Sequence, residues 1–296
     1  MFNISNIISP IMFADDTTLV LSNSNFNSLI SNVNDGLNAF VTWFKMNKLS
    51  LNIKKSNFII FSGKKLYDKE LSKISIESTQ LTQVSSTRFL GIIIDESLSW
   101  REQICCISKK IYKSIGIIRK VRHLVTKECL LTLYYSLIYP YLSYCNIVWG
   151  STCTTALQKI LILQNRFVRL ASRSVWDATA APLYKNLQIL TIYDINIYQI
   201  AIFLYKIFSQ EENVPEHFKS YFAANSDFHS YSTRQASALH RPKCLESRSQ
   251  FLIRYRGVKV WNSWYHIANN CRSLSIFKSR SREHLIQKCS QESSLF

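Results

Sequence analysis

The sequence predicts an α+β fold over about the first 95 residues and a mostly α fold over the rest of the chain. Short runs rich in β-branched and aromatic residues concentrate before residue 95, whereas longer runs with apolar residues three and four positions apart dominate after it. The charge changes at the same place: residues 1–98 carry 9 basic and 8 acidic side chains, while residues 99–174 carry 12 and 2. We therefore expect three regions, 1–98, 99–174 and 175–296.

The composition is that of a globular protein with a basic surface. At 296 residues, 47% of them hydrophobic, the chain can bury a sizeable core. Its 36 Lys and Arg against 19 Asp and Glu give a net charge of +17, and residues 175–296 carry 15 basic and 9 acidic side chains. Such an excess is typical of a protein with a polyanionic partner, and nucleic acid is the first candidate. The alternative is a basic surface without a specific partner.

The first region reads as a hairpin, a helix and several short strands. Residues 4–21 predict the hairpin, and residues 25–46 predict an amphipathic helix because apolar residues recur along one face for five turns. Residues 49–53 alternate apolar and polar side chains, and residues 57–61 form a second strand-like run. Residues 64–80 are polar and are expected to be a loop, and residues 88–95 read as a strand in which Gly91 allows a close approach or a bulge.

The remaining elements are predicted to be helices, with one strand-like run. Ser99 and Glu102 match a capping box at the start of a helix over 100–123, and Thr126 caps a second helix that ends near residue 139. Further helices are expected over 141–149, 155–173, 191–208 and 273–286. Residues 209–250 are polar and mixed, and residues 251–264 read as a strand followed by a helix.

One segment has the length of a membrane span, but its composition favours the interior of a folded protein. Residues 130–150 are interrupted by Pro140 and contain five tyrosines, so two buried helices meeting at Pro140 are the better interpretation. The eight cysteines include no CxxC pair and no metal-ligand spacing with histidine, and no signal peptide opens the chain. We therefore expect reduced thiols in a nuclear or cytoplasmic protein that is neither secreted nor bound to a membrane.

Two adjacent aspartates lie at the connection of the first hairpin. Asp15 and Asp16 repel each other, and burying either one unpaired costs several kcal/mol. Mg²⁺ offsets this cost because it takes one or two carboxylates together with substrate phosphates, and Mn²⁺ accepts the same oxygen ligands. The alternative is an ordinary turn, in which aspartate is common.

The residues around this pair resemble a known family. "FADDTTLV" (13–20) resembles the active-site motif of reverse transcriptases, and "WFKMNKLSLNIKKSNFIIF" (43–61) and "FLGIIIDESLSW" (89–100) are similar to the blocks that follow it. Residues 130–150, "LQKILILQNRFVRL" (157–170) and "VWNSWYHIANNCRSLSIFK" (260–278) resemble the helical regions after the polymerase core. The order of all these pieces resembles the C-terminal part of a non-LTR (LINE-type, jockey-like) retrotransposon reverse transcriptase.

The resemblance implies a partial polymerase palm over 1–98, a helical thumb over 99–174 and a helical C-terminal region. It implies RNA-directed DNA polymerase activity, with an RNA template, a DNA primer and dNTPs as partners. Asp15 and Asp16 would hold the metal, and Lys54 would give a proton to, or stabilise charge on, the incoming triphosphate. Phe13, Ala14 and Lys55 would contact the nucleotide, and the segment Phe89, Leu90 and Gly91 would grip the primer. The cations expected to contact nucleic acid are Lys109, Lys110, Lys113, Arg119, Lys120, Arg122, Arg166 and Arg169.

Each of these roles has a structural alternative. Lys54 and Lys55 also suit a solvated strand end, residues 89–91 also suit plain core packing, and the cationic helix also suits a solvated charged face. The family carries a further metal-binding aspartate on a strand upstream of the pair, whereas only fourteen residues precede Asp15 here. We therefore expect a truncated fragment that is inactive alone and whose missing N-terminal half is a candidate partner. The alternatives are a non-catalytic nucleic-acid-binding remnant and a remnant that aggregates because an apolar sheet edge is exposed.

Overall fold

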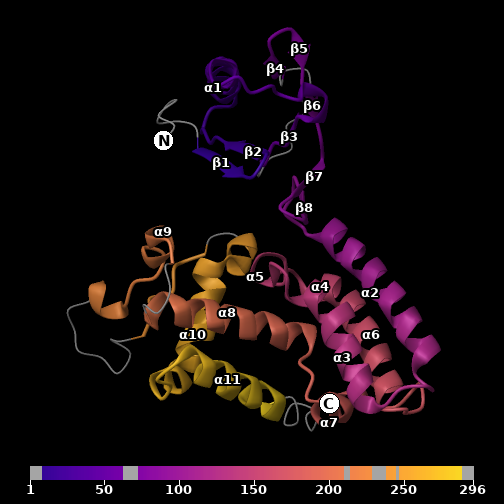
Figure 1. Cartoon of the computed structure of the whole chain (residues 1–296). Helices are drawn as coiled ribbons and strands as arrows, with labels where there is room; N and C mark the ends of the chain where they lie inside the picture. The colour runs from indigo at the N-terminus through magenta and orange to yellow at the C-terminus, as the bar shows by residue number, and fades with distance from the viewer. Residues whose placement is uncertain (1–8, 63–72, 210–213, 229–237, 245–246, 289–296) are drawn as a thin grey trace. The chain divides into compact units, whose positions relative to one another are not determined.

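The computed structural model divides into two compact units, one that ends at Ser99 and one that starts at Trp100 (Figure 1). Each unit is described by itself. The residues described are 9–62, 73–209, 214–228, 238–244 and 247–288. The first unit combines one long helix with small sheets, and the second is helical, so the predicted change from α+β to mostly α is confirmed.

The first unit opens with the predicted hairpin. Strands β1 (Ser9–Phe13) and β2 (Asp16–Val20) pair antiparallel, with Phe13 opposite Asp16 and Ser9 opposite Val20. Helix α1 (Phe26–Met46) follows, one residue shorter than expected at its start because Asn25 is its cap. The side-chain oxygen of Asn25 accepts hydrogen bonds from two amides of the first turn, which satisfies donors that a helix start leaves free.

Short strands and one helical turn complete this unit. The prediction of a strand over 49–53 is wrong, because residues 49–52 are irregular and η1 (Ile53–Lys55) is a single 3₁₀ turn. The alternation there serves packing instead, since Leu51 and Ile53 lie against the core without pairing to a strand. Only β3 (Asn57–Phe58) forms within 57–61, and it pairs parallel with β6 (Thr82–Gln83).

The expected loop over 64–80 is wrong for its last part, while residues 63–72 lie outside the described residues. Strands β4 (Ser75–Ile76) and β5 (Thr79–Gln80) form a small hairpin. Ile74, Ile76 and Leu81 are buried against apolar residues of α1 and form a core cluster of the unit. A few apolar side chains among polar ones are enough to hold this hairpin, although the segment is polar on average.

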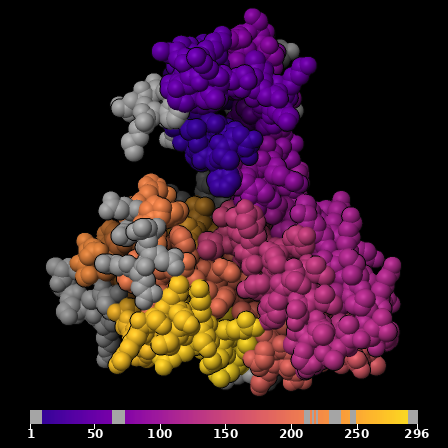
Figure 2. Space-filling model, viewed as in Figure 1, coloured from indigo at the N-terminus to yellow at the C-terminus, as the bar shows by residue number. Residues whose placement is uncertain are grey.

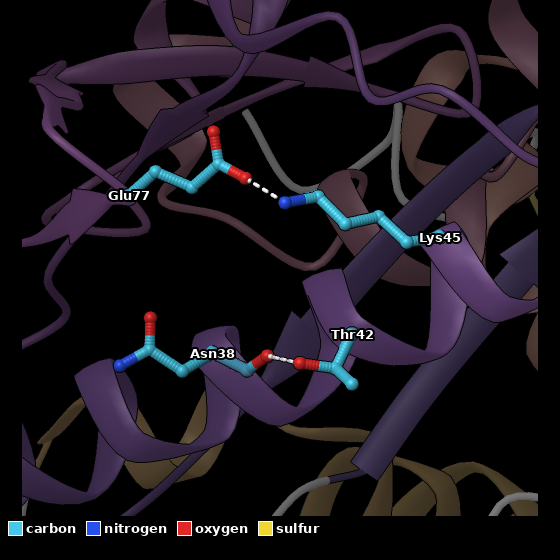
Figure 3. A network of polar contacts seen from close by, with 4 residues as sticks. All are labelled: Asn38, Thr42, Lys45 and Glu77. Carbon is cyan, nitrogen blue, oxygen red and sulfur yellow. Dashed lines mark hydrogen bonds and ion pairs between the residues drawn. The ribbon is translucent and has the colours of Figure 1, made fainter.

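Polar contacts tie α1 to this hairpin. The Asn34 amide accepts a hydrogen bond from the Ser75 N–H at 3.1 Å and donates one to the Lys73 carbonyl at 3.2 Å. The ammonium group of Lys45 lies 2.5 Å from the Glu77 carboxylate, and Figure 3 shows this ion pair. Both side chains of this ion pair are well exposed, so it contributes about 1 kcal/mol or less, and the apolar cluster carries the packing.

The last strands of the first unit form a second clear hairpin. Strands β7 (Ser86–Phe89) and β8 (Ile92–Asp95) pair antiparallel and replace the single strand expected over 88–95. Leu90 and Gly91 form the turn, with φ of 44° and 85°. Two-residue turns with positive φ match the right-handed twist of the strands, so the glycine reverses the chain instead of making a bulge.

The second unit consists of helices, and the predicted ones follow in the expected order. They begin with α2 (Arg101–Val121), α3 (Lys127–Leu137), α4 (Tyr139–Ser143), α5 (Asn146–Trp149) and α6 (Thr154–Ala171). They continue with α7 (Ala180–Leu187), α8 (Ile192–Ser209), α9 (Glu216–Lys219), α10 (Ile253–Asn269) and α11 (Leu274–Lys288). Short 3₁₀ turns, η3 (Asn225–Asp227) and η4 (Ser247–Phe251), lie between α9 and α10. Figure 1 shows α2 along α6, and α8 beside α10 and α11.

Several details differ from the prediction. The structure caps α2 with Trp100 in a left-handed conformation, one residue after the expected cap Ser99. The helix expected over 141–149 is broken at Cys145, whose φ is 49°. The strand expected near residue 251 is wrong, because α10 begins at Ile253, and the short helices α7 and α9 were not predicted. Helices of eight residues or fewer are too short to show a periodic pattern, and packing on α6 and α11 stabilises α7.

The segment 130–150 forms helices that bury one side in the second unit, as predicted. Its fully buried large hydrophobic side chains are Leu130, Tyr134, Ile138, Leu142 and Trp149. Helix α3 ends just before Pro140, which lies in the first turn of α4, where a missing N–H is tolerated. In the described part of the chain no single helix is long and apolar enough to cross a membrane, although α7 and α8, bent by 44°, pass that test as a pair.

Candidate functional site

The β1–β2 hairpin presents the two aspartates at its tip. Phe13 and Asp16 are the last residues to pair, so Ala14 and Asp15 form a two-residue turn. Ala14 has a φ of 51°, in the left-handed region that a residue with a Cβ seldom enters. Asp15 and Asp16 are both exposed, and within the described residues neither forms an ion pair. The local geometry therefore offers two neighbouring carboxylates to solvent, as a metal-binding turn or an ordinary polar turn would.

The hairpin exposes apolar side chains next to these carboxylates. Ile11, Met12 and Phe13 of β1 are 44%, 48% and 63% exposed. The sheet to which they belong has two strands among the described residues, so both edges of β1–β2 lack further strands there. Exposed apolar side chains on a strand edge mark a surface that other chain segments or ligands can cover.

The carboxylate pair fits a divalent cation only in part. Its donors are oxygens, which suit Mg²⁺ and Mn²⁺. Among the described residues no set of three or more His, Cys, Asp or Glu side chains gathers where it could hold a metal. Asp95, another carboxylate of this unit, is buried and accepts hydrogen bonds from the Ser97 hydroxyl at 2.5 Å and the Ser99 N–H at 2.9 Å. Asp95 therefore shapes the turn that leads to α2.

The other predicted residues of the first unit lie on two different elements. Lys54 and Lys55 are exposed on the single turn η1, between α1 and β3. Phe89, Leu90 and Gly91 lie at the tip of the β7–β8 hairpin, where Phe89 and Leu90 are half-buried. The tip geometry of β7–β8 fits a packing role as well as a contact with a ligand.

Helix α2 separates its cations from its buried face. Its buried stripe consists of Ile104, Ile107, Ile111, Ile115 and Ile118. Lys109, Lys113 and Lys120 are exposed and, by their spacing on the helix, lie opposite this stripe. Three ammonium groups along one exposed face can contact a negatively charged backbone, and a solvated charged face has the same arrangement.

The remaining cations on and near α2 differ in exposure. Arg119 is exposed. The ammonium group of Lys110 lies over the Tyr141 ring, 5.1 Å from its centroid. Arg122 is half-buried and its Nε donates to His123 at 3.3 Å.

The two predicted cations of α6 have different surroundings. Arg166 is exposed and, in the described part, makes no hydrogen bond through its side chain. Arg169 is half-buried, and its Nε donates to the carbonyl oxygen of Ala178 at 2.7 Å. Arg169 therefore holds the segment that follows α6, a role that the sequence did not indicate, and Arg166 is the cation of this pair that is free for a partner.

The second unit contains a basic cleft that the sequence pattern does not predict. It lies between η4, α10 and the end of α11, and Arg256 and Lys259 of α10 line it together with Phe251 and His284. The pattern that indicates this cleft is the spacing of Arg256 and Lys259, three positions apart beside aromatic residues, which places both cations on one face of a helix. Because residues around 251–256 read as a strand, in which alternate side chains lie on opposite faces, the pattern does not predict a shared basic face.

The chain is similar to polymerases of transposable elements from Drosophila melanogaster. It is 22% identical over 185 residues to a probable RNA-directed DNA polymerase from transposon X-element, a match that covers 62% of this chain and 20% of that protein. It is 24% identical over 186 residues to a probable RNA-directed DNA polymerase from transposon BS, covering 61% of this chain and 20% of the relative. It is 23% identical over 181 residues to the RNA-directed DNA polymerase from mobile element jockey, covering 60% and 19%.

The matched segment spans about a fifth of the length of these curated relatives. No family model matches the chain. No solved structure matches it either. The resemblance expected from the motifs is nevertheless confirmed: over about 60% of its length, this chain is similar to the RNA-directed DNA polymerases of non-LTR retrotransposons.

Proposed function

We propose that this chain is the part of a non-LTR retrotransposon reverse transcriptase that carries the Asp-Asp hairpin of the palm, the thumb and a helical C-terminal region. The observation that carries the proposal is the β1–β2 turn, which presents Asp15 and Asp16 side by side. Helix α1, the β7–β8 hairpin and the cationic helix α2 follow this turn in the order of the resemblance. The curated relatives support the same family.

The proposed reaction is template-directed nucleotidyl transfer. The 3′-oxygen of the DNA primer forms a bond to the α-phosphorus of a dNTP, its proton is released, and pyrophosphate leaves. Asp15 and Asp16 would hold Mg²⁺ or Mn²⁺, which supplies positive charge at the phosphates. Phe13 and Ala14 would contact the nucleotide, and Lys54 or Lys55 would supply a proton or a positive charge to the leaving pyrophosphate.

We further propose that the chain by itself does not polymerise. The resemblance implies a third carboxylate, and the described residues bring no third His, Cys, Asp or Glu to the pair. Positioning of template, primer and nucleotide accounts for most of such catalysis, so an incomplete site loses most of it. The expected result is no Mg²⁺-dependent dNTP incorporation by the isolated chain, and a measured incorporation would contradict this proposal.

Metal binding at the hairpin can be tested without polymerase activity. Titration with Mn²⁺, followed by electron paramagnetic resonance of the free ion, should show a site that is lost in the double variant D15N/D16N. Glu77→Gln together with Glu96→Gln is the matched control, because it removes two exposed carboxylates from the same unit. Equal Mn²⁺ binding by the wild type and D15N/D16N would contradict the assigned role of the pair.

A non-catalytic nucleic-acid-binding protein is the second candidate, and the exposed face of α2 favours it. Binding of an RNA–DNA duplex should weaken steeply with salt, since each contacted phosphate contributes a slope of about 0.9 in log affinity against log salt. The triple variant K109Q/K113Q/K120Q should lower this slope by about 2.7, whereas K48Q/K185Q/K278Q, which removes exposed lysines elsewhere, should not.

The same measurement separates the two candidates. Under the non-catalytic hypothesis D15N/D16N binds the duplex as the wild type does, with or without Mg²⁺. Under the polymerase hypothesis Mg²⁺ and a complementary dNTP strengthen binding of the duplex, and D15N/D16N removes that gain. An unchanged salt slope in K109Q/K113Q/K120Q would contradict the role of α2 under both.

A further inference from the structure

The basic cleft of the second unit has the size of a ligand site. Its volume is about 860 Å³, and its walls come from η4, α10, the end of α11 and one residue of α8. Figure 2 shows α11 (yellow) at the surface of this unit. Pockets that hold small molecules usually measure a few hundred to about 1,000 Å³, so the cleft can take one or two nucleotide-sized groups.

All ionisable side chains that line the cleft, apart from one tyrosine, are basic. They are Arg256, Lys259, His284 and Lys288, and no described Asp or Glu lines it. Arg256 is half-buried, and this burial lowers the pKa of its guanidinium group without any offset from a carboxylate. In the described part of the chain the Arg256 side chain has no hydrogen-bond or ion-pair partner. A desolvated guanidinium group without a partner is unfavourable, so the cleft favours an anion.

Arg256 and Lys259 can act on the same anion. They lie three positions apart on α10, which places both on one face of the helix and toward the same cleft. A guanidinium fork and a neighbouring ammonium group together suit phosphate oxygens, which accept several charge-assisted hydrogen bonds.

Aromatic side chains form the rest of the wall. Phe251 is 41% exposed at the end of η4, whereas Trp264 is buried and packs edge-on against His284, with ring centroids 5.4 Å apart. The Tyr255 ring is held by Arg241, whose guanidinium carbon lies 4.5 Å from the ring centroid. An exposed ring beside a phosphate-binding pair is the arrangement on which single-stranded bases stack.

We propose that this cleft binds a nucleotide unit, with Arg256 and Lys259 contacting its phosphate and Phe251 stacking on its base. The preferred source is an unpaired stretch of RNA or DNA, and a free mononucleotide presents the same chemistry. The site shares no residue with the Asp-Asp hairpin or with α2, so its test does not depend on whether the proposed function is correct.

Photocrosslinking of the full chain tests the proposal directly. A ten-nucleotide RNA containing 5-iodouridine should crosslink to Phe251, which trypsin releases in the peptide 249–254, as identified by mass spectrometry. The double variant R256Q/K259Q should lose at least about 90% of this crosslink and lower the salt slope of binding by about 1.4, since two single-strand phosphate contacts are removed. A matched control is R272Q/K278Q, which removes one arginine and one lysine, both exposed and outside the cleft.

A second variant keeps the proposal testable if R256Q/K259Q does not fold. F251L keeps the charge of the cleft and should weaken binding of the oligonucleotide by about 5-fold or more, because a stacked ring is lost. Suppression of the crosslink by millimolar UMP identifies a free-nucleotide site, whereas resistance to UMP identifies a strand site. A wild-type chain without crosslink at 249–254, or an equal crosslink in R256Q/K259Q and R272Q/K278Q, overturns the proposal.

Discussion

At the scale of single residues, Gly150 occupies a position where a side chain does not fit. A Cβ at this position would lie 2.6 Å from the backbone oxygen and from the amide oxygen of Asn146. Asn146 cannot move freely, because its amide donates to the Leu142 carbonyl at 2.8 Å and its oxygens accept from Asn196. The requirement for glycine here comes from the buried asparagine pair and not from an unusual φ.

The first prediction concerns this glycine. Gly150→Ala should lower the free energy of unfolding by about 2 kcal/mol or more, since overpacking forces the buried network to shift. Gly116→Ala is the matched control, because Gly116 is exposed on α2 and a Cβ there would meet nothing within 4 Å. That control should raise the free energy of unfolding by about 0.8 kcal/mol through helix propensity. Urea unfolding of both variants checks the contrast, and equal effects would contradict it.

The second prediction concerns His284, which lies in the wall of the basic cleft. Burial, together with the nearby His266 and Lys288, lowers its pKa below the ordinary value of 6.5. Below pH 6.5 His284 is therefore protonated in the unfolded chain while it is still neutral in the folded chain. The free energy of unfolding falls as the pH decreases, until His284 is protonated in the folded state as well.

The measurement is the change in Tm between about pH 7.5 and about pH 5.5, a range that spans the ordinary pKa of histidine. His284→Gln should show a smaller decrease in Tm over this range than the wild type. His123→Gln, which removes an exposed imidazole from the same unit, should keep the wild-type decrease. A His284→Gln variant with the full wild-type decrease would show that this imidazole is not a source of the pH dependence.

At the scale of elements, one buried glutamine joins three helices. Gln164 of α6 donates to the Tyr134 hydroxyl of α3 at 3.1 Å and to the Leu190 carbonyl at 3.2 Å. Its side-chain oxygen accepts from the Ile192 N–H, at the start of α8, at 2.8 Å. The amide thus satisfies polar groups of the chain that would otherwise be buried without partners, and it sets where α8 begins relative to α6.

The third prediction follows from this junction. Gln164→Leu should lower the free energy of unfolding by about 3 kcal/mol, because it leaves a buried N–H and a buried carbonyl unsatisfied. Gln158→Leu is the control on the same helix, since Gln158 is exposed and accepts a hydrogen bond from the Tyr193 hydroxyl, and it should change stability by about 0.5 kcal/mol at most. Chemical unfolding followed by circular dichroism measures both, and a loss below about 1 kcal/mol in Gln164→Leu would contradict the role of the junction.

At the scale of the whole molecule, the two units differ in the size of their cores. The buried cluster of the first unit consists of Ile74, Ile76 and Leu81, with partly buried residues of α1 and η1 around it. The second unit completely buries large side chains, among them Trp149, Tyr134, Phe167 and Phe277. Because stability depends on the apolar area removed from water, the second unit should be the more stable of the two.

The fourth prediction tests this difference by dividing the chain at the unit boundary. Residues 100–296 alone should unfold cooperatively, with a Tm within a few degrees of the main transition of the full chain, because their core lies within the unit. Residues 1–99 alone should unfold at a lower temperature or aggregate, since β1 exposes apolar side chains at its edge. Calorimetry of the three proteins checks this, and a loss of cooperative unfolding in 100–296 would contradict it.

Much of the candidate site was predictable because its residues are neighbours in sequence. A short connection between β-rich runs specifies a hairpin, so the sequence alone places Asp15 and Asp16 at a turn. The exposed lysines of α2 were predictable for the same reason, since a helix with a buried isoleucine stripe turns its charged residues outward. Two features depend on how the chain folds back on itself and were not predicted. Arg169 donates to the Ala178 carbonyl in an irregular segment after α6, and the cleft around Arg256 forms only where η4 and α10 meet the end of α11.

The sequence by itself thus determined the order of the main helices and strands, the two carboxylates at the hairpin tip and the placement of positive charge, because each follows from periodicity and turn chemistry within a few residues. Only the tertiary structure decided that Gln164 joins α3, α6 and α8, that Gly150 must lack a side chain, and that Arg256 and His284 line one cleft. The first two features depend on which buried polar groups meet in the core, and the third depends on how α10 packs beside α11. Burial leaves a polar group no water to bond with, so its partner is set by packing between segments that the local pattern does not bring together.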